Sequence, residues 1–380
     1  MDAARKTPDQ VTQRLDELYG HLQDAAATQA GYPCNQLFDY SELYRFLGLS
    51  INNVGDPFHN SNFWVNTHEF EREVVNGFAY LMGMEPDRCW GYVTHGGTEG
   101  NMYGLYLARE LYPDGLVYFS EDTHYSVLKT MHILNTRSIM IKSRENGEID
   151  YDDLRETVRI HRDVPGIVLA NIGTTMKGAV DDVRRIRGIF RDLAMTDYYI
   201  HADAALSGMI LPFVDEPQPH RFEDGYHSVA VSGHKMIGAP LPCGIVLAKR
   251  DSVARISRAI EYVGVLDTTL SGSRNAFTPL ILWYALKRNG LSGFRQTVAA
   301  ALAVADYAVA RFDDNGIPAW RHKNSLTVVF PRPPKSVTEK WQIAVYRDIA
   351  HIITMPHVTR DTVDAIVADC ALALQQGDCS

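Results

Sequence analysis

The stretch YYIHADAALSG, residues 198–208, joins a β-rich run to a charged residue and then to small residues. Tyr198–Ala202 has the composition of a strand that is buried on both faces of a sheet, and Asp203 follows it directly. A carboxylate that emerges from such a strand is largely buried, so it needs a positive partner or strong hydrogen bonds. A protonated heterocyclic nitrogen is one such partner, and capping of a following helix is the alternative.

Comparable runs lie on both sides of this stretch and alternate with helix-like segments. The predicted strands are Gly91–Thr94, Leu116–Ser120, Ser138–Lys142, Gly166–Ile172, Tyr198–Ala202, Ser228–Val231 and Gly244–Lys249. The predicted helices between them include Thr98–Leu111, Tyr125–Leu134, Tyr151–His161 and Val183–Leu193. This alternation predicts an α/β domain in which helices flank a mostly parallel sheet.

Two changes in the pattern divide the chain. Residues 1–50 have helical character, residues 51–275 carry the alternation, and from 276 helices dominate, with one clear strand at Leu326–Phe330. We therefore expect an N-terminal helical segment (1–50), a large domain (51–275) and a smaller C-terminal α+β domain (276–380). The length of 380 residues suits this division, because single cores stop growing near ~250–300 residues.

The composition argues against several classes of protein. With 46% hydrophobic and 22% charged residues, the chain has the composition of an ordinary soluble globular protein, and no membrane span or secretory signal is expected. A net charge of −9 without basic clusters argues against nucleic-acid binding. Five cysteines without a CxxC pair predict reduced thiols in the cytoplasm, and 14 histidines without HExxH spacing predict no metal site.

Three further motifs come directly after predicted strands. Open α/β sheets bind their ligands at this place, beyond the carboxyl ends of the strands. THGGTEGN (94–101) offers paired glycines and a helix N-terminus, which suit a phosphate. SEDTHYS (120–126) contains His124, and SGHK (232–235) ends in Lys235, whose burial would lower the pKa of its amine and favour imine formation. Each motif alone also fits a structural turn, a surface histidine or a solvated lysine. Their order across about 140 residues favours one shared site.

In this order the sequence resembles the group II pyridoxal-phosphate-dependent amino acid decarboxylases of fold type I, and most closely the bacterial histidine decarboxylases among them. The resemblance runs from about Phe38 to the last helix. It rests on GYVTHGGTEGNMYG, DTHYSV, GEIDYDDL, ANIGTTMKGAVDD, HADAALSGMILPFVD, VSGHKMIG, PCGIV and GSRN. It implies pyridoxal 5'-phosphate as the cofactor, a seven-stranded sheet in a large cofactor-binding domain, and a homodimer with active sites at the subunit interface.

The resemblance also implies a role for each matching residue. Lys235 matches the lysine that forms a Schiff base with the cofactor, and Asp203 matches the carboxylate that pairs with the pyridine nitrogen. His124 matches the residue that stacks on the ring and borders the substrate. The other matches are Gly97, Thr98, Ser232 and His234 around the phosphate, Ala205 on the second ring face, and Ser273 toward a neighbouring subunit's phosphate. The candidate donors of a proton to the substrate Cα are Lys235, His234 and Tyr262.

The implied reaction is decarboxylation of L-histidine to histamine and CO2, with L-serine to ethanolamine as the alternative. Two departures from the pattern, Asn275-Ala276-Phe277 for Asn-Gly-His and His95 for Asn or Cys, bear on specificity rather than on the cofactor. The polar segment 52–60 is a candidate pocket wall or a plain loop. An aminotransferase would need a carboxylate-binding arginine and a keto acid. A non-catalytic relative would not need the intact Lys235, Asp203 and His124.

Overall fold

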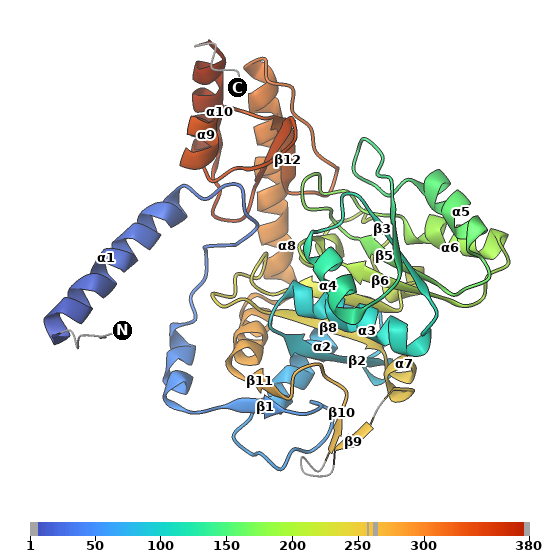
Figure 1. The fold of residues 1–380 in the computed structure, drawn as a ribbon. Coiled ribbons are helices and arrows are strands. Elements are labelled where there is room, and N and C mark those ends of the chain that lie inside the picture. Colours follow the sequence, from blue (N-terminus) through green and yellow to red (C-terminus); the bar gives the residue numbers. More distant parts are fainter. Residues whose placement is uncertain (1–6, 257, 261–264, 376–380) are drawn as a thin grey trace.

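The computed structural model describes residues 7–256, 258–260 and 265–375. Its centre is a seven-stranded sheet with the order β2-β8-β7-β6-β5-β3-β4 (Figure 1). Strand β8 runs antiparallel to its neighbours β2 and β7, and the other pairs in this sheet are parallel. The strands are β2 (Cys89–Thr94), β3 (Leu116–Ser120), β4 (Ser138–Ile141), β5 (Gly166–Asn171), β6 (Tyr198–Asp203), β7 (Ser228–Ser232) and β8 (Gly244–Lys249). All seven predicted strands are confirmed.

Helices cover both faces of this sheet because its strands bury side chains in both directions. Ile167 and Leu169 pack with α3, α4 and α7, whereas Val168 and Ala170 pack into the second core with α2, α5 and α6. The four predicted helices are confirmed with ends that agree within a residue. The helices are α2 (His68–Leu81), α3 (Gly97–Leu111), α4 (Ser126–Leu134), α5 (Tyr151–Ile160), α6 (Val183–Asp192) and α7 (Arg250–Ala254).

The two ends of the chain lie beside this α/β unit. Helix α1 (Pro8–Ala27) extends away from it, and a 3-10 helix (Ser41–Gly48) follows, as Figure 1 shows. Helix α8 (Phe277–Asp314), which is kinked at Gly290, leads to a three-stranded antiparallel sheet with the order β12-β14-β13. The strands of this sheet are β12 (Thr327–Pro331), β13 (Ala344–Tyr346) and β14 (Ile349–Ile353), and two helices accompany them, α9 (Lys335–Lys340) and α10 (Arg360–Gln375). The sequence predicted only β12. Strand β13 is short, largely exposed and lacks a clear apolar run, and β14 was missed although four of its five residues are buried.

A fully buried ion pair ties the segment before α8 to the large unit. Arg274 lies on β11 (Ser273–Asn275), which pairs with β1 (Asn52–Val54), and its guanidinium donates to both carboxylate oxygens of Glu71 on α2. Both side chains are completely buried, and Asn53 and the Val93 backbone also donate to Glu71. Removal of one partner from such a pair costs about 3–5 kcal/mol, so the pair holds β11 firmly in place.

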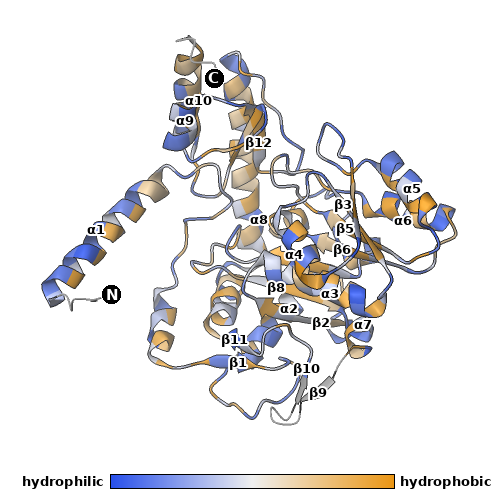
Figure 2. Cartoon of the chain, viewed as in Figure 1, coloured by the Kyte–Doolittle hydropathy of each residue, from blue (hydrophilic) through white to orange (hydrophobic). Residues whose placement is uncertain are grey.

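Two short strands complete the lower end of the molecule in Figure 1, namely β9 (Arg258–Ile260) and β10 (Val265–Asp267), which pair antiparallel. The surface helices carry both apolar and polar residues, whereas apolar residues are concentrated in the central sheet, as the colours of Figure 2 show. Among the described residues, no helix combines the length and the apolar composition that a bilayer crossing requires.

Candidate active site

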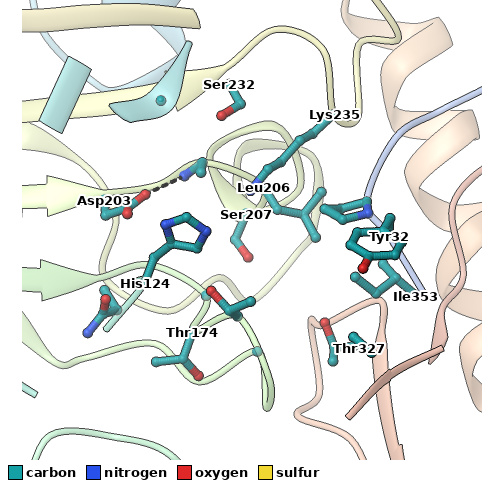
Figure 3. Close-up of a pocket in the computed structure, with 18 of the residues that line it drawn as sticks. Tyr32, His124, Thr174, Asp203, Leu206, Ser207, Ser232, Lys235, Thr327 and Ile353 are labelled. Carbon is teal, nitrogen blue, oxygen red and sulfur yellow. Dashed lines mark hydrogen bonds between the residues drawn. The ribbon is translucent and has the colours of Figure 1, made fainter. Parts of the chain in front are cut away.

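A cavity of about 210 Å³ opens at the carboxyl ends of β5, β6 and β7 (Figure 3). The N-terminus of α3, the segment near Tyr32, and residues of β12 and β14 complete its wall. Eight of the predicted site residues line it: Lys235, Asp203, His124, Gly97, Thr98, Ala205, Ser232 and His234. Tertiary structure therefore brings together residues that are as far as 138 positions apart in the sequence (97 to 235).

Two other predicted regions lie elsewhere on this chain. Ser273 is exposed on β11, where its hydroxyl accepts a hydrogen bond from the Asn52 side chain at 3.1 Å. Its predicted contact is with a neighbouring subunit's phosphate, so that role stays a prediction. The polar segment 52–60 forms β1 and the following loop and does not line the cavity of its own chain. The candidate proton donor Tyr262 lies outside the described residues.

Lys235 enters the cavity from the turn that follows β7. Backbone hydrogen bonds fix this turn, because the Lys235 carbonyl accepts from Asn35 at 3.3 Å and from Gly238 at 3.1 Å. Burial lowers the pKa of the Lys235 amine below its ordinary value, and the charge of Asp203 partly opposes this shift. A larger neutral fraction makes the amine a better nucleophile toward an aldehyde.

Asp203 is the last residue of β6, and its carboxylate is held at both oxygens. Oδ1 accepts from the Ala205 backbone at 3.1 Å, and Oδ2 accepts from Nδ2 of Asn101 at 2.7 Å. The residue is only 8% exposed. A carboxylate so oriented and so buried favours a positively charged partner on its cavity side.

His124 lies in the loop between β3 and α4, and Figure 3 shows its ring beside Asp203, with Lys235 approaching from the other side. The hydroxyl of Ser126 lies 2.8 Å from Nδ1 of His124 and fixes the direction of the ring. Burial lowers the pKa of the His124 imidazole, and Lys235 adds to this effect while Asp203 opposes it. A neutral, flat ring at this position is suited to stacking on an aromatic ligand.

The N-terminus of α3 and the end of β7 form an anion cradle. A Cβ atom on Gly97 would lie 2.8 Å from Oγ of Ser232, so glycine allows this close approach without a shift of the Ser232 side chain. Thr98 adds a hydroxyl within the first turn of α3, whose free N–H groups favour an anion. Nδ1 of His234 lies 2.8 Å from the Cys243 carbonyl, which anchors that ring at the cradle.

These features fit pyridoxal phosphate. One cavity holds a buried amine with a lowered pKa, a carboxylate for a protonated ring nitrogen, an imidazole for the ring face and a helix N-terminus for the phosphate. These four features match the four chemical parts of the cofactor: its aldehyde, ring nitrogen, ring face and phosphate.

The sequence motifs did not reveal every residue of the wall. Tyr32, Thr327, His351 and Ile353 come from the two ends of the chain, which meet where the Ala30 carbonyl accepts from Ile353 N at 2.8 Å. Nε2 of His351 also lies 3.2 Å from the Gly31 carbonyl. No local pattern marks these residues, since the packing of β14 against the N-terminal segment and of Thr327 against Gly178 brings them to the cavity.

Comparison with known proteins agrees with this geometry. Residues 106–317 match the family model described as the pyridoxal-dependent decarboxylase conserved domain. The chain is 47% identical to a histidine decarboxylase from Mesorhizobium japonicum, over 94% of this chain and 97% of that protein. It is 48% identical to a histidine decarboxylase from Morganella morganii, over 94% and 96%. The structure is similar to L-methionine decarboxylase from Streptomyces sp. 590, with a TM-score of 0.89, 28% identity and coverage of 98% and 97%.

Proposed function

Since the chain belongs to the pyridoxal-dependent decarboxylase family, we propose that it uses pyridoxal 5'-phosphate to convert L-histidine to histamine and CO2. One observation carries the choice of substrate: the identity of 47–48% to histidine decarboxylases extends over nearly the whole of both chains. The cavity offers polar and apolar contacts for a substrate side chain, because it is lined by the aliphatic residues Leu206 and Ile353 and by hydroxyl groups, among them that of Ser207 (Figure 3).

When bound, pyridoxal phosphate supplies an electron sink, because its protonated ring accepts the electron pair that departing CO2 leaves on Cα. Lys235 would hold the cofactor's aldehyde carbon, and its amine is placed to carry a proton at Nζ. Asp203 would keep the ring nitrogen protonated through its negative charge. His124 would cover one ring face, and Ala205 would pack against the other. The phosphate would be held by the cradle, which consists of Gly97, Thr98, Ser232 and His234.

The burial of Asp203, which is only 8% exposed, would also favour the chemistry. A low local dielectric constant would strengthen its interaction with a positive ring nitrogen. We propose that residues 51–275 form the domain that binds the cofactor, with residues 276–380 as the smaller domain that closes the wall through Thr327 and Ile353.

A product assay tests the substrate. We expect the purified holoenzyme to release histamine from L-histidine without any keto acid, and to release CO2 in equal amount. L-serine, L-methionine and L-glutamate are assayed beside it under the same conditions. Ethanolamine formation without histamine would contradict the histidine proposal and favour serine. A requirement for a keto acid would instead indicate an aminotransferase.

We also propose a homodimer with active sites at the subunit interface, in which Ser273 reaches the partner's phosphate. The apolar face of α1 supports this proposal, because Val11, Leu15, Leu18, Tyr19 and Leu22 are spaced along one helix face and each is at least 45% exposed. We expect sedimentation at the mass of two chains at micromolar concentration. Sedimentation as a single chain at catalytic concentrations with full activity would contradict this arrangement.

A cytoplasmic location and a role in histamine biosynthesis follow as proposals from the same function. Four cysteines in the described part of the chain, Cys34, Cys89, Cys243 and Cys370, are free thiols, as in proteins of reducing compartments.

A further inference from the structure

We infer that Asn101 and His201 are positioning residues that, together with Ser228, hold Asp203 as an oriented carboxylate facing the cofactor's ring nitrogen. This inference rests on the proposed role of Asp203, but not on which amino acid is the substrate. Neither Asn101 nor His201 was assigned a role by the sequence motifs, although both lie inside them.

The contacts form an unbroken chain beneath the cavity. Nδ2 of Asn101 lies 2.7 Å from Oδ2 of Asp203, and Oδ1 of Asn101 lies 3.0 Å from Nε2 of His201. Nδ1 of His201 lies 2.7 Å from Oγ of Ser228. His201 and Asp203 are two residues apart on β6 and so face the same side, toward α3, which carries Asn101. Ser228 is the partner of His201 in the register of β7.

The position of each proton in this chain follows from the acceptor at its end. An ionised carboxylate only accepts hydrogen bonds, so Asn101 must turn its NH2 group to Asp203 and its carbonyl oxygen to His201. That oxygen in turn requires a proton on Nε2 of His201. Burial lowers the pKa of His201 to about 4, so the ring is neutral near pH 7 and its Nδ1 carries no proton. Ser228 therefore donates to Nδ1.

All three hydrogen bonds consequently point the same way, toward Asp203. Aligned donors polarise one another, which stabilises negative charge at the end of the chain in surroundings of low dielectric constant. The Ala205 N–H is a second donor to Asp203, at the other carboxylate oxygen. Because His201 is neutral, the chain stabilises the negative charge of Asp203 without adding a cation that would compete with the ring nitrogen.

The packing around His201 indicates that the site is built for an imidazole. His201 is completely buried, and Asn101 is only 2% exposed. A Cβ atom on Gly104, one turn after Asn101 on α3, would lie 2.1 Å from Nδ1 of His201. Glycine at this position is thus what allows the ring to fit between the sheet and the helix.

Nuclear magnetic resonance of isotope-labelled histidine tests the proton positions in the protein without any turnover. We expect His201 to be neutral with its proton on Nε2 near neutral pH, in both apoenzyme and holoenzyme. Its signal is identified by its loss in His201→Gln or its displacement in Asn101→Leu. A proton on Nδ1 alone, or a protonated ring at neutral pH, would overturn the inference.

Cofactor affinity tests the consequence, by titration of apoenzyme with pyridoxal phosphate. We expect Asn101→Leu to weaken binding by about tenfold or more, because a charge-assisted hydrogen bond to Asp203 is lost. Asn101→Asp, which keeps the shape of the side chain, should weaken it at least as much, since two facing carboxylates cannot both stay ionised. It serves as the second variant if the leucine variant does not fold. Asn324→Leu and His220→Gln, buried polar residues outside the cavity, should bind the cofactor within about twofold of the wild type.

Asp203→Asn separates the possible failures. If it loses the cofactor whereas both Asn101 variants bind normally, the positioning role is wrong and the proposed function stands. If Asp203→Asn also binds and turns over as the wild type does, the proposed role of Asp203 itself is wrong, and the inference falls with it.

Discussion

Lys235→Ala is expected to lower kcat/KM for decarboxylation by at least about 1000-fold. The variant loses the amine that would hold the cofactor's aldehyde, and it loses a proton carrier inside the cavity. A positioned general acid or base alone contributes about 10²–10⁴-fold to the rate. Because this variant loses two roles at once, its loss of activity should exceed that of most single substitutions. Initial rates of amine release at saturating cofactor, together with the absorbance spectrum of the dialysed protein, measure the effect.

Two controls distinguish loss of chemistry from loss of fold. Lys249 lies at the end of β8, outside the cavity, and burial lowers the pKa of its amine too, so Lys249→Ala tests the removal of a partly buried lysine. Its activity should stay within about twofold of the wild type. In urea, the free energy of unfolding of Lys235→Ala should be close to that of the wild-type apoenzyme. Burial of the amine costs desolvation energy, so its removal does not take away a large stabilising contribution. Full turnover of Lys235→Ala with an unchanged spectrum would refute its assignment.

Asp203→Asn is expected to lower kcat/KM by about 10²–10⁴-fold. Loss of one partner from a buried ionic contact costs about 3–5 kcal/mol, and each 1.36 kcal/mol corresponds to a factor of ten. The new amide would also present its NH2 group or its oxygen to Asn101 without a negative charge to offer the ring nitrogen. Rates at saturating cofactor separate the loss of catalysis from the loss of cofactor binding.

Asp224 provides the matched control for this substitution. It is a buried carboxylate, 7% exposed, that pairs with Arg184 and accepts from the backbone of His220 and Arg221, away from the cavity. Asp224→Asn should reduce stability but leave kcat/KM within about threefold of the wild type at temperatures where it is folded. Equal losses of activity in both variants would mean that Asp203 acts through the fold and not through the cofactor.

The strands were predictable because their burial leaves a local trace. A central parallel strand such as β5 needs apolar side chains on both faces, so GIVLA is recognisable without knowledge of its neighbours. Strand β13 and the ion pair of Glu71 with Arg274 leave no such trace. A charged residue in a helix normally faces solvent, and nothing within His68–Leu81 shows that Glu71 is buried against a residue about 200 positions later.

The candidate site likewise contains features that the sequence could predict and features that it could not. That Lys235, Asp203, His124 and the glycine-rich turn lie together was predictable, because each lies at or just after the end of a strand and the carboxyl ends of parallel strands meet at one edge of the sheet. The proton positions on His201 and the amide direction of Asn101 were not, because they depend on acceptors that β6, β7 and α3 bring together. Tyr32, Thr327 and Ile353 reach the cavity only through the packing of the two chain ends.

By itself, the sequence determined the layered α/β fold, because the burial of strands is a local property of the chain. Its resemblance to a family indicated the cofactor, and it predicted the residues that would hold that cofactor. Only the tertiary structure decided that Asp203 is held by Asn101, that Arg274 is neutralised by Glu71, and that both chain ends wall the cavity. Hydrogen bonds and ion pairs require atoms within about 3–4 Å, and residues separated by 100 or more positions meet that condition only when the whole chain has folded.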